Sequence, residues 1–230
     1  MKIIWLGHGS FRIEIEDQVL LIDPWLTGNP MLAEDQHEAA LAGATQILVT
    51  HGHFDHTTDI AMVATRTGAP VAGMYELMDW MVTQGVKEPT GFNKGGSISC
   101  GAVKVTMVPA SHSSSVAGDA GAIYTGGEIG YMISGEGKTV YVSGDTDIMA
   151  DMDWMGDFHK PQVGILSAGG FYTMDMAGAA YAAKRYFNFE TVIPCHYRTF
   201  PALEQSAKVL ADGLPGVNVV EPEVMQAIEI

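Results

Sequence analysis

The sequence is poor in cysteine. Cys100 and Cys195 are its only cysteines, and they do not form the short paired spacing of a zinc knuckle or a redox motif. Two cysteines are also too few for the disulfide framework of a small secreted protein. We therefore expect reduced thiols and a cytoplasmic location.

Basic residues are scarce as well. The chain has 12 Lys and Arg against 27 Asp and Glu, which gives a formal net charge of -15. Nucleic-acid binders neutralise phosphates with clustered Lys and Arg, and no basic stretch here is longer than "AAKRYF". This deficit argues against a nucleic-acid partner and indicates an acidic, well solvated surface.

Long apolar runs and low-complexity linkers are also missing. No segment approaches the ~18 consecutive apolar residues that a membrane-spanning helix needs, so we expect no membrane role. Nothing rich in Pro, Gly and Ser divides the chain, and no repeat is present. With 47% hydrophobic and 17% charged residues, we predict one folded domain over residues 1–230.

The hydrophobic pattern predicts a mixed α/β protein. Short β-branched runs predict strands over residues 2–6, 18–23, 46–50, 69–73, 103–108, 129–133, 138–144, 163–168, 191–195 and 217–222. Helical patterns cover residues 58–68, 75–85, 174–187 and 202–214. This mixture suggests sheets packed on each other with helices outside.

The glycine-rich stretch 117–130, "AGDAGAIYTGGEIG", is expected to be a surface loop followed by a hairpin. It lacks the strand-to-helix context and the final Lys of a phosphate-binding loop. Nucleotide binding is therefore not expected.

Several side chains that can bind metal follow predicted strands. The apolar runs lead directly into His51, His112, Asp145 and His196. In layered α/β proteins the loops beyond the strand ends gather at one edge and form the site. Residues far apart in the sequence are thus expected to meet there.

The stretch "THGHFDH" concentrates His51, His53, Asp55 and His56 after one strand. Imidazole and carboxylate are the usual ligands of catalytic zinc. An irregular turn can direct these side chains to two neighbouring ions, which lie about 3.5–4 Å apart in two-metal sites. The spacing therefore suits a pair of ions with a shared carboxylate.

Together, "THGHFDH", His112, Asp145 in "SGDTD" and His196 in "PCHY" resemble the metallo-β-lactamase superfamily pattern in the same chain order. Further stretches, including "LGHGSF", "LLIDPWL" and "HYRTFP", resemble a group of predicted metal-dependent hydrolases related to the ascorbate phosphate lactonases. The resemblance covers nearly the whole chain. It implies a four-layer αββα sandwich with the metals at one edge of the sheets.

The same resemblance assigns roles residue by residue. His51, His53 and His112 would hold one ion, Asp55, His56 and His196 a second, and Asp145 would bridge them. The expected cofactors are two divalent ions, Zn²⁺ first, with Mn²⁺, Fe²⁺ or Ni²⁺ as other choices. A hydroxide between the ions would attack the substrate, and Asp55 would orient it or accept its proton.

Residues around this edge carry less definite expectations. His8 is either a structural histidine or a proton donor or substrate contact, and we include it with Asp55 among the catalytic residues. Asp23 is expected to brace the histidine loop. Arg198 is more readily a surface ion pair than an anion clamp. Residues 171–174 are candidates for a pocket wall, and Cys195 is excluded from the metal ligands because it faces the opposite side of its strand.

The leading hypothesis is a dinuclear hydrolase that cleaves a small ester, lactone or phosphodiester, and the resemblance to the lactonases suggests a lactonase-like reaction. An iron-dependent oxidoreductase of the same fold is the first alternative, although the di-iron branch that resembles this fold carries Glu at the position of His53. An RNA-processing nuclease is the second, and the charge deficit opposes it. Relatives commonly assemble, so we expect a homo-oligomer.

Overall fold

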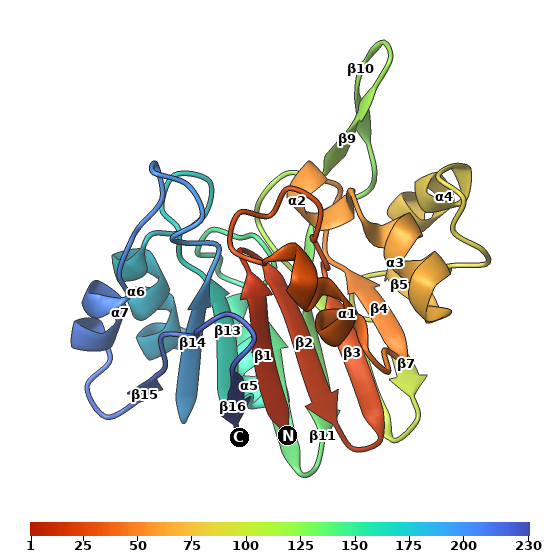
Figure 1. Cartoon of the computed structure of the whole chain (residues 1–230). Coiled ribbons are helices and arrows are strands. Elements are labelled where there is room, and N and C mark those ends of the chain that lie inside the picture. The colour runs from red at the N-terminus through yellow and green to blue at the C-terminus, as the bar shows by residue number, and fades with distance from the viewer.

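The chain forms two seven-stranded sheets. They face each other across the core (Figure 1). The structure, a computed structural model, describes all residues 1–230. The first sheet has the order β16 (Ala227–Glu229), β1 (Lys2–Gly7), β2 (Ser10–Ile15), β3 (Gln18–Ile22), β4 (Gln46–Val49), β5 (Val71–Met74) and β6 (Thr90–Phe92). The second has the order β15 (Asn218–Val219), β14 (Thr191–Cys195), β13 (Val163–Ser167), β12 (Lys138–Val142), β11 (Ile129–Gly135), β8 (Val103–Pro109) and β7 (Ser97–Cys100).

Helices lie outside the two sheets. On the first sheet these are η1 (Glu34–Gln36), α1 (His37–Leu41), α3 (Ile60–Thr67) and α4 (Tyr75–Thr83), and on the second α5 (Met152–His159), α6 (Met176–Tyr186) and α7 (Lys208–Gly213). The short helix α2 (Phe54–Thr57) lies at the upper edge in Figure 1, below a hairpin of β9 (Ser115–Gly118) and β10 (Gly121–Tyr124). The predicted four-layer α/β sandwich is confirmed.

The burial of the strands follows from this layering. Every residue of β13 is buried, because helices cover one face of that strand and the other sheet covers the opposite face.

At the start of α6, the Asp175 carboxylate accepts a hydrogen bond from the Gly178 amide at 2.6 Å. This N-cap satisfies one of the free amides of the first turn and fixes where the helix begins. None of the helices is both long and apolar enough to span a bilayer.

Most predicted elements are present, with some corrections. The predicted helix over residues 202–214 is wrong in its first half, since only Lys208–Gly213 is helical. The Glu204 amide donates to the Gly169 carbonyl and the Arg198 amide donates to the Glu204 carbonyl, so tertiary contacts use the backbone of this segment. The hairpin predicted after residue 117 comes earlier, at 115–124. The strands β2, β6, β7 and β16 and the helices α1, α2 and α5 were not predicted.

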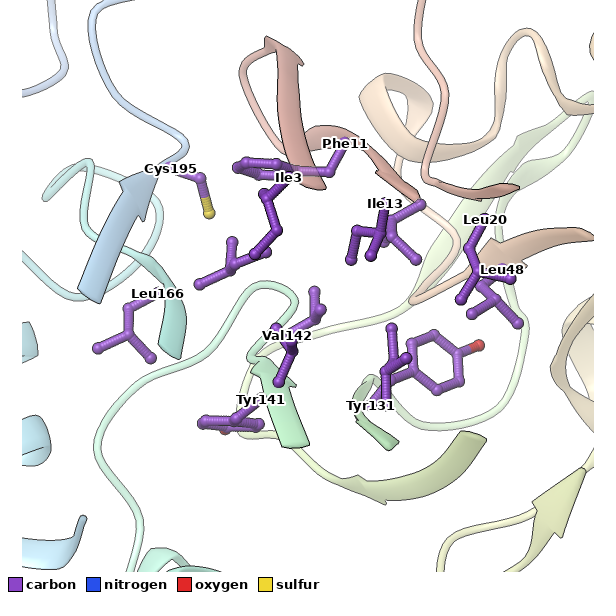
Figure 2. Close-up of a cluster of buried hydrophobic side chains, with 14 of the residues drawn as sticks. Ile3, Phe11, Ile13, Leu20, Leu48, Tyr131, Tyr141, Val142, Leu166 and Cys195 are labelled. Carbon is purple, nitrogen blue, oxygen red and sulfur yellow. The ribbon is translucent and has the colours of Figure 1, made fainter. Parts of the chain in front are cut away.

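A single hydrophobic core of 60 buried residues joins the layers. Figure 2 shows apolar side chains of β1 and β2, among them Ile3, Phe11 and Ile13, facing those of the second sheet, such as Val142. Successive side chains of a strand point to opposite faces of the sheet, so every second residue points into this core. The core therefore holds the two sheets in a fixed relation.

Two buried tyrosines of adjacent strands differ in their polar contacts. The Tyr131 hydroxyl, from the second sheet, donates to the Val49 carbonyl of the first sheet at 2.7 Å. The Tyr141 hydroxyl is buried without a hydrogen-bond partner, and its ring stacks on Phe187 with centroids 5.3 Å apart. One hydroxyl thus links the sheets, whereas the other is buried at a cost.

We expect Tyr131→Phe to lower the free energy of unfolding by about 0.5–1.5 kcal/mol, because it removes a buried intersheet hydrogen bond. Tyr141→Phe should leave stability unchanged or raise it, because it removes an unpaired buried hydroxyl. Urea unfolding of both variants tests the pair. Equal losses in the two variants would contradict this account.

Candidate metal centre

The site lies where strands of both sheets end. β1, β3 and β4 of the first sheet run parallel to one another, as do β8, β12 and β14 of the second. Their carboxyl ends therefore meet at one edge of each sheet. The candidate residues that follow these six strands are His8, Asp23, His51, His112, Asp145 and His196. The loop after β4 and the start of α2 add His53, Asp55 and His56.

Three histidines form the first group of the site. His51 Nε2 and His53 Nδ1 are 3.0 Å apart, and His112 Nε2 lies 3.2 Å from the same His53 nitrogen. The three ligand atoms lie within 4.8 Å of one another. Residues 51 and 112, which are distant in sequence, therefore converge as predicted.

The predicted second group is Asp55, His56 and His196. The structure brings the ligand atoms of His8, Asp55 and His196 within 4.8 Å of one another, and likewise those of His51, His56 and Asp145. His56 Nε2 and His196 Nε2 lie 3.3 and 3.5 Å from Asp55 Oδ2. The two groups meet at Asp145, whose Oδ2 is 3.0 Å from His196 Nε2 and 3.6 Å from His56 Nε2. The same oxygen is 3.9 and 3.7 Å from the Nε2 atoms of His51 and His112. Asp145 Oδ2 thus lies within 3.9 Å of four histidines, two from each predicted group. The seven residues are here called the histidine–aspartate cluster.

Neighbouring side chains fix the orientation of these imidazoles. Asp23 Oδ2 lies 2.7 Å from His56 Nδ1, and its carboxylate also accepts from the Thr50 amide and hydroxyl. The bracing contact expected of Asp23 is therefore present. His53 Nε2 lies 3.2 Å from Ser113 Oγ, which leaves His53 Nδ1 directed at the first group.

The cluster has the composition and spacing of a cation site. His56 Nε2 is buried without a hydrogen-bond partner, although it lies between the carboxylates of Asp55 and Asp145. A buried unpaired nitrogen is costly, and a bound cation would remove that cost. Bonds of about 2.0–2.1 Å in a tetrahedron place zinc ligands roughly 3.3 Å apart. The observed separations of 3.0–3.9 Å lie around that value. The residues fit divalent cations.

The electrostatics of the cluster favour positive charge. Burial opposes the charged form of His196, but Asp145 and Asp55 raise its pKa to about 9. Burial likewise opposes the ionised form of Asp145, yet His196 and His56 hold its pKa well below the ordinary value. Two buried carboxylates without Lys or Arg partners thus require cations at this position, whether protons or metal ions.

Comparison with known proteins agrees with this geometry. Residues 18–197 match the family described as the β-lactamase superfamily domain. The chain belongs to this superfamily. A UPF0173 metal-dependent hydrolase of Ruegeria pomeroyi is 64% identical, and one of Cereibacter sphaeroides is 63% identical, each with both chains covered completely. The solved structure of Igni18, a metallo hydrolase from Ignicoccus hospitalis, superposes with a TM-score of 0.83 at 32% identity, covering 100% of this chain and 98% of that one.

The protein is therefore a metal-dependent hydrolase of the metallo-β-lactamase fold. Five residues of its histidine–aspartate cluster line the floor of a cavity of about 820 Å³, namely His53, Asp55, His112, Asp145 and His196. His51 and His56 are buried and do not line it. That volume is in the range of small-molecule sites.

His8 lies fully buried beside the second group of this hydrolase. Its Nε2 is 2.8 Å from Asp55 Oδ2, and its Nδ1 is 2.8 Å from the Thr199 hydroxyl. Burial lowers the pKa of His8 to about 4 in spite of the hydrogen bond to Asp55. A neutral His8 carries one ring proton, and Asp55 is the partner that needs a donor. His8 Nε2 therefore donates to Asp55, and Nδ1 accepts from Thr199.

Three site residues have left-handed backbone conformations directly after their strands. The φ angles are +53° at His8, +43° at Asp23 and +58° at His196. Such conformations cost about 1–3 kcal/mol each for residues other than glycine and gather at functional sites. The residue after His8 is Gly9, which has no side chain. A Cβ at this position would lie 2.9 Å from His56 Cε1, which is too close. The backbone itself is bent to direct these side chains into the centre.

The cavity walls differ in part from expectation. Of the stretch 171–174, only Tyr172 lines the cavity. Arg198 forms the expected ion pair and does not line the cavity. Its guanidinium pairs with Glu223 at 3.8 Å and lies over the rings of Trp5 and Tyr197. Phe200 and the β9–β10 hairpin also line the cavity, and neither was predicted as part of its wall. The exposed aromatic in "HFDH", Phe54, was a signal that could have been used.

Replacing Asp23 by Asn should weaken metal binding about 10- to 100-fold, because His56 Nδ1 would lose its carboxylate partner. Equilibrium dialysis against Zn²⁺ measures this. Asp17→Asn, at an exposed turn, removes the same charge and should leave the affinity unchanged. A loss of thermal stability in Asp23→Asn without any change in affinity would contradict a role of Asp23 in the metal site.

Proposed function

We propose that this hydrolase binds two divalent cations and uses water to cleave a small ester, lactone or phosphodiester. His51, His53 and His112 would hold one ion, and Asp55, His56 and His196 the other. Asp145 would contact both. The observation that carries the proposal is the convergence of both groups on Asp145 Oδ2 at the floor of one cavity.

Bound divalent cations lower the pKa of water so that hydroxide is available near neutral pH, and they polarise a carbonyl or phosphoryl oxygen. Zn²⁺ is the expected ion, since imidazole and carboxylate are its common ligands. Asp55, which has an oxygen at the centre, would accept the proton of the attacking water.

No side-chain nucleophile competes with water in this arrangement. Ser113 Oγ is 3.2 Å from His53 Nε2, which resembles a serine–histidine pair. His53, however, directs its other nitrogen at His51 and His112, so Ser113 is better placed to orient a metal ligand. The Cys195 thiol is buried, does not line the cavity, and has its pKa raised well above the ordinary value by burial.

His8 would hold Asp55 in its productive position. A carboxylate that both approaches a cation and accepts a proton must keep one orientation, and the His8 Nε2–H to Asp55 Oδ2 hydrogen bond supplies it. Thr199 in turn fixes the tautomer of His8. His8 thus supports the catalytic step through Asp55.

Removal of metal should abolish hydrolysis of an ester or phosphodiester substrate, because water is the proposed nucleophile and the cations activate it. Addition of Zn²⁺ or Mn²⁺ should restore the activity. Elemental analysis of the restored wild-type protein should find two ions per chain. Asp145→Ala should bind fewer than two, because both groups lose a shared oxygen.

Ser113→Ala should keep two ions and at least about a tenth of the wild-type activity, in line with the loss of a single supporting contact. Undiminished turnover by metal-free protein would overturn the proposal. So would complete inactivity of Ser113→Ala with both ions bound, or stoichiometric iron accompanied by oxygen consumption.

His8→Ala should lower kcat about 10- to 100-fold, with KM and metal content nearly unchanged, because Asp55 loses its supporting donor. His8→Gln should recover part of kcat, since an amide N–H can replace Nε2–H. Steady-state kinetics with metal analysis of the same samples measures both variants. If both variants keep full kcat, or if both simply lose metal, the role given to His8 is wrong.

A further inference from the structure

Above the metal floor, the cavity is walled by apolar side chains. Six residues supply this apolar wall, namely Phe54, Val116, Ala117, Ala122, Tyr172 and Phe200. They come from α2, from the β9–β10 hairpin and from the loops that follow β13 and β14. The hairpin projects beyond the sandwich at this edge (Figure 1). Its Val116, Ala117 and Ala122 line the cavity, and Val116 also packs against the hydrophobic core.

The aromatic members of the wall stand close to the cluster but remain open to solvent. The Tyr172 ring is 6.4 Å from the His196 ring, and the Phe200 ring is 5.5 Å from the His8 ring. Phe54, between His53 and Asp55 in the sequence, is 64% exposed and touches Trp25 edge-on at 5.8 Å. Tyr172 is also exposed, at 55%, whereas Phe200 is half-buried. Two exposed aromatics in one concave site indicate a surface that a ligand covers.

No Lys or Arg lines the cavity, and Asp55 and Asp145 at the floor are its only carboxylates. Arg198 comes two residues after His196, which lines the cavity. Its guanidinium, however, is held against Trp5, Tyr197 and Glu223. A charged group of the substrate that lies away from the metal floor would lose its hydration without gaining a partner, which is unfavourable. The wall therefore selects against charge at that end of the substrate.

Building on the proposed function, we propose that the substrate is a small ester or lactone whose body, beyond the bond that is cleaved, is uncharged and mainly apolar. A substrate bearing a phosphate or carboxylate remote from the reacting bond, as in a sugar-phosphate lactone, does not match these walls. The reaction is hydrolysis: water adds its oxygen to the acyl carbon, the bond to the leaving oxygen breaks, and that oxygen takes a proton.

Matched substrates test the inference with the metal-loaded wild-type enzyme. p-Nitrophenyl hexanoate and p-nitrophenyl 5-carboxypentanoate share a leaving group and chain length and differ in a terminal carboxylate. The neutral ester should have at least about a tenfold higher kcat/KM, mainly through KM. Equal or better turnover of the charged ester would overturn the inference.

Binding separates this inference from the proposed function. Hexanohydroxamic acid and its analogue with a terminal carboxylate both offer the same chelating head to the metals, and calorimetry with the metal-loaded protein compares their tails. If neither ester is cleaved but the neutral tail binds at least about tenfold tighter, ester hydrolysis fails while the character of the walls stands. If the charged tail binds as tightly as the neutral one, the inference is wrong whatever the activity.

Ala122→Lys should reverse the selection, because it places a cation in the apolar wall. The ratio of kcat/KM for the charged ester to that for the neutral ester, and the matching ratio of hydroxamate affinities, should rise about tenfold or more. Ile123→Lys, at the adjacent exposed position that does not line the cavity, adds the same charge and should leave both ratios unchanged. Equal shifts in the two variants would show a general charge effect and would refute the role of the wall.

Discussion

Burial of the Asp145 carboxylate among imidazoles is the constraint on which the site depends. Asp145 is almost inaccessible to solvent, and no Lys or Arg compensates its charge. A carboxylate in such surroundings is tolerated only when positive charge lies beside it. A protonated imidazole provides this charge directly. A neutral imidazole provides it by binding a metal cation. The same burial that makes this carboxylate costly without a neighbouring cation therefore favours metal binding.

The sandwich meets this constraint by bringing strand ends of two sheets to one place. No single loop could offer ligands from several directions around one oxygen, whereas parallel strand ends in facing sheets do so. The core between the sheets keeps these ends in register. Asp23 shows how the support extends outward, because it fixes both the His56 ring and the Thr50 backbone that precedes His51. The rigid core thus keeps the side chains of the metal centre in fixed positions.

Much of this arrangement could be predicted from the sequence, for a physical reason. Apolar β-branched runs mark strands locally, and polar residues directly after them must lie at a sheet edge, which located His51, His112, Asp145 and His196. β2 could have been predicted as well, because Phe11, Ile13 and Ile15 alternate with Arg12 and Glu14, which is the pattern of a strand with one polar face. The burial of Arg12 on that polar face could not be predicted. Arg12 is accommodated by Glu14 and by the Ala40 and Ala42 carbonyls, which are contacts that only the folded chain provides. The left-handed backbone at His8 and the truncated α7 likewise depend on tertiary contacts.

The metal floor and the cavity wall answer to different physical requirements. The floor must balance buried charge, so its residues are restricted to imidazole and carboxylate, and the cluster carries little information about the substrate. The wall makes no such demand, because Phe54 and Ala122 neither stabilise the cluster nor satisfy its hydrogen bonds. We infer that their apolar character reflects the substrate that the cavity receives. The proposed selectivity accordingly depends on the apolar wall around the substrate. The proposed reactivity depends on the buried charges of the histidine–aspartate cluster.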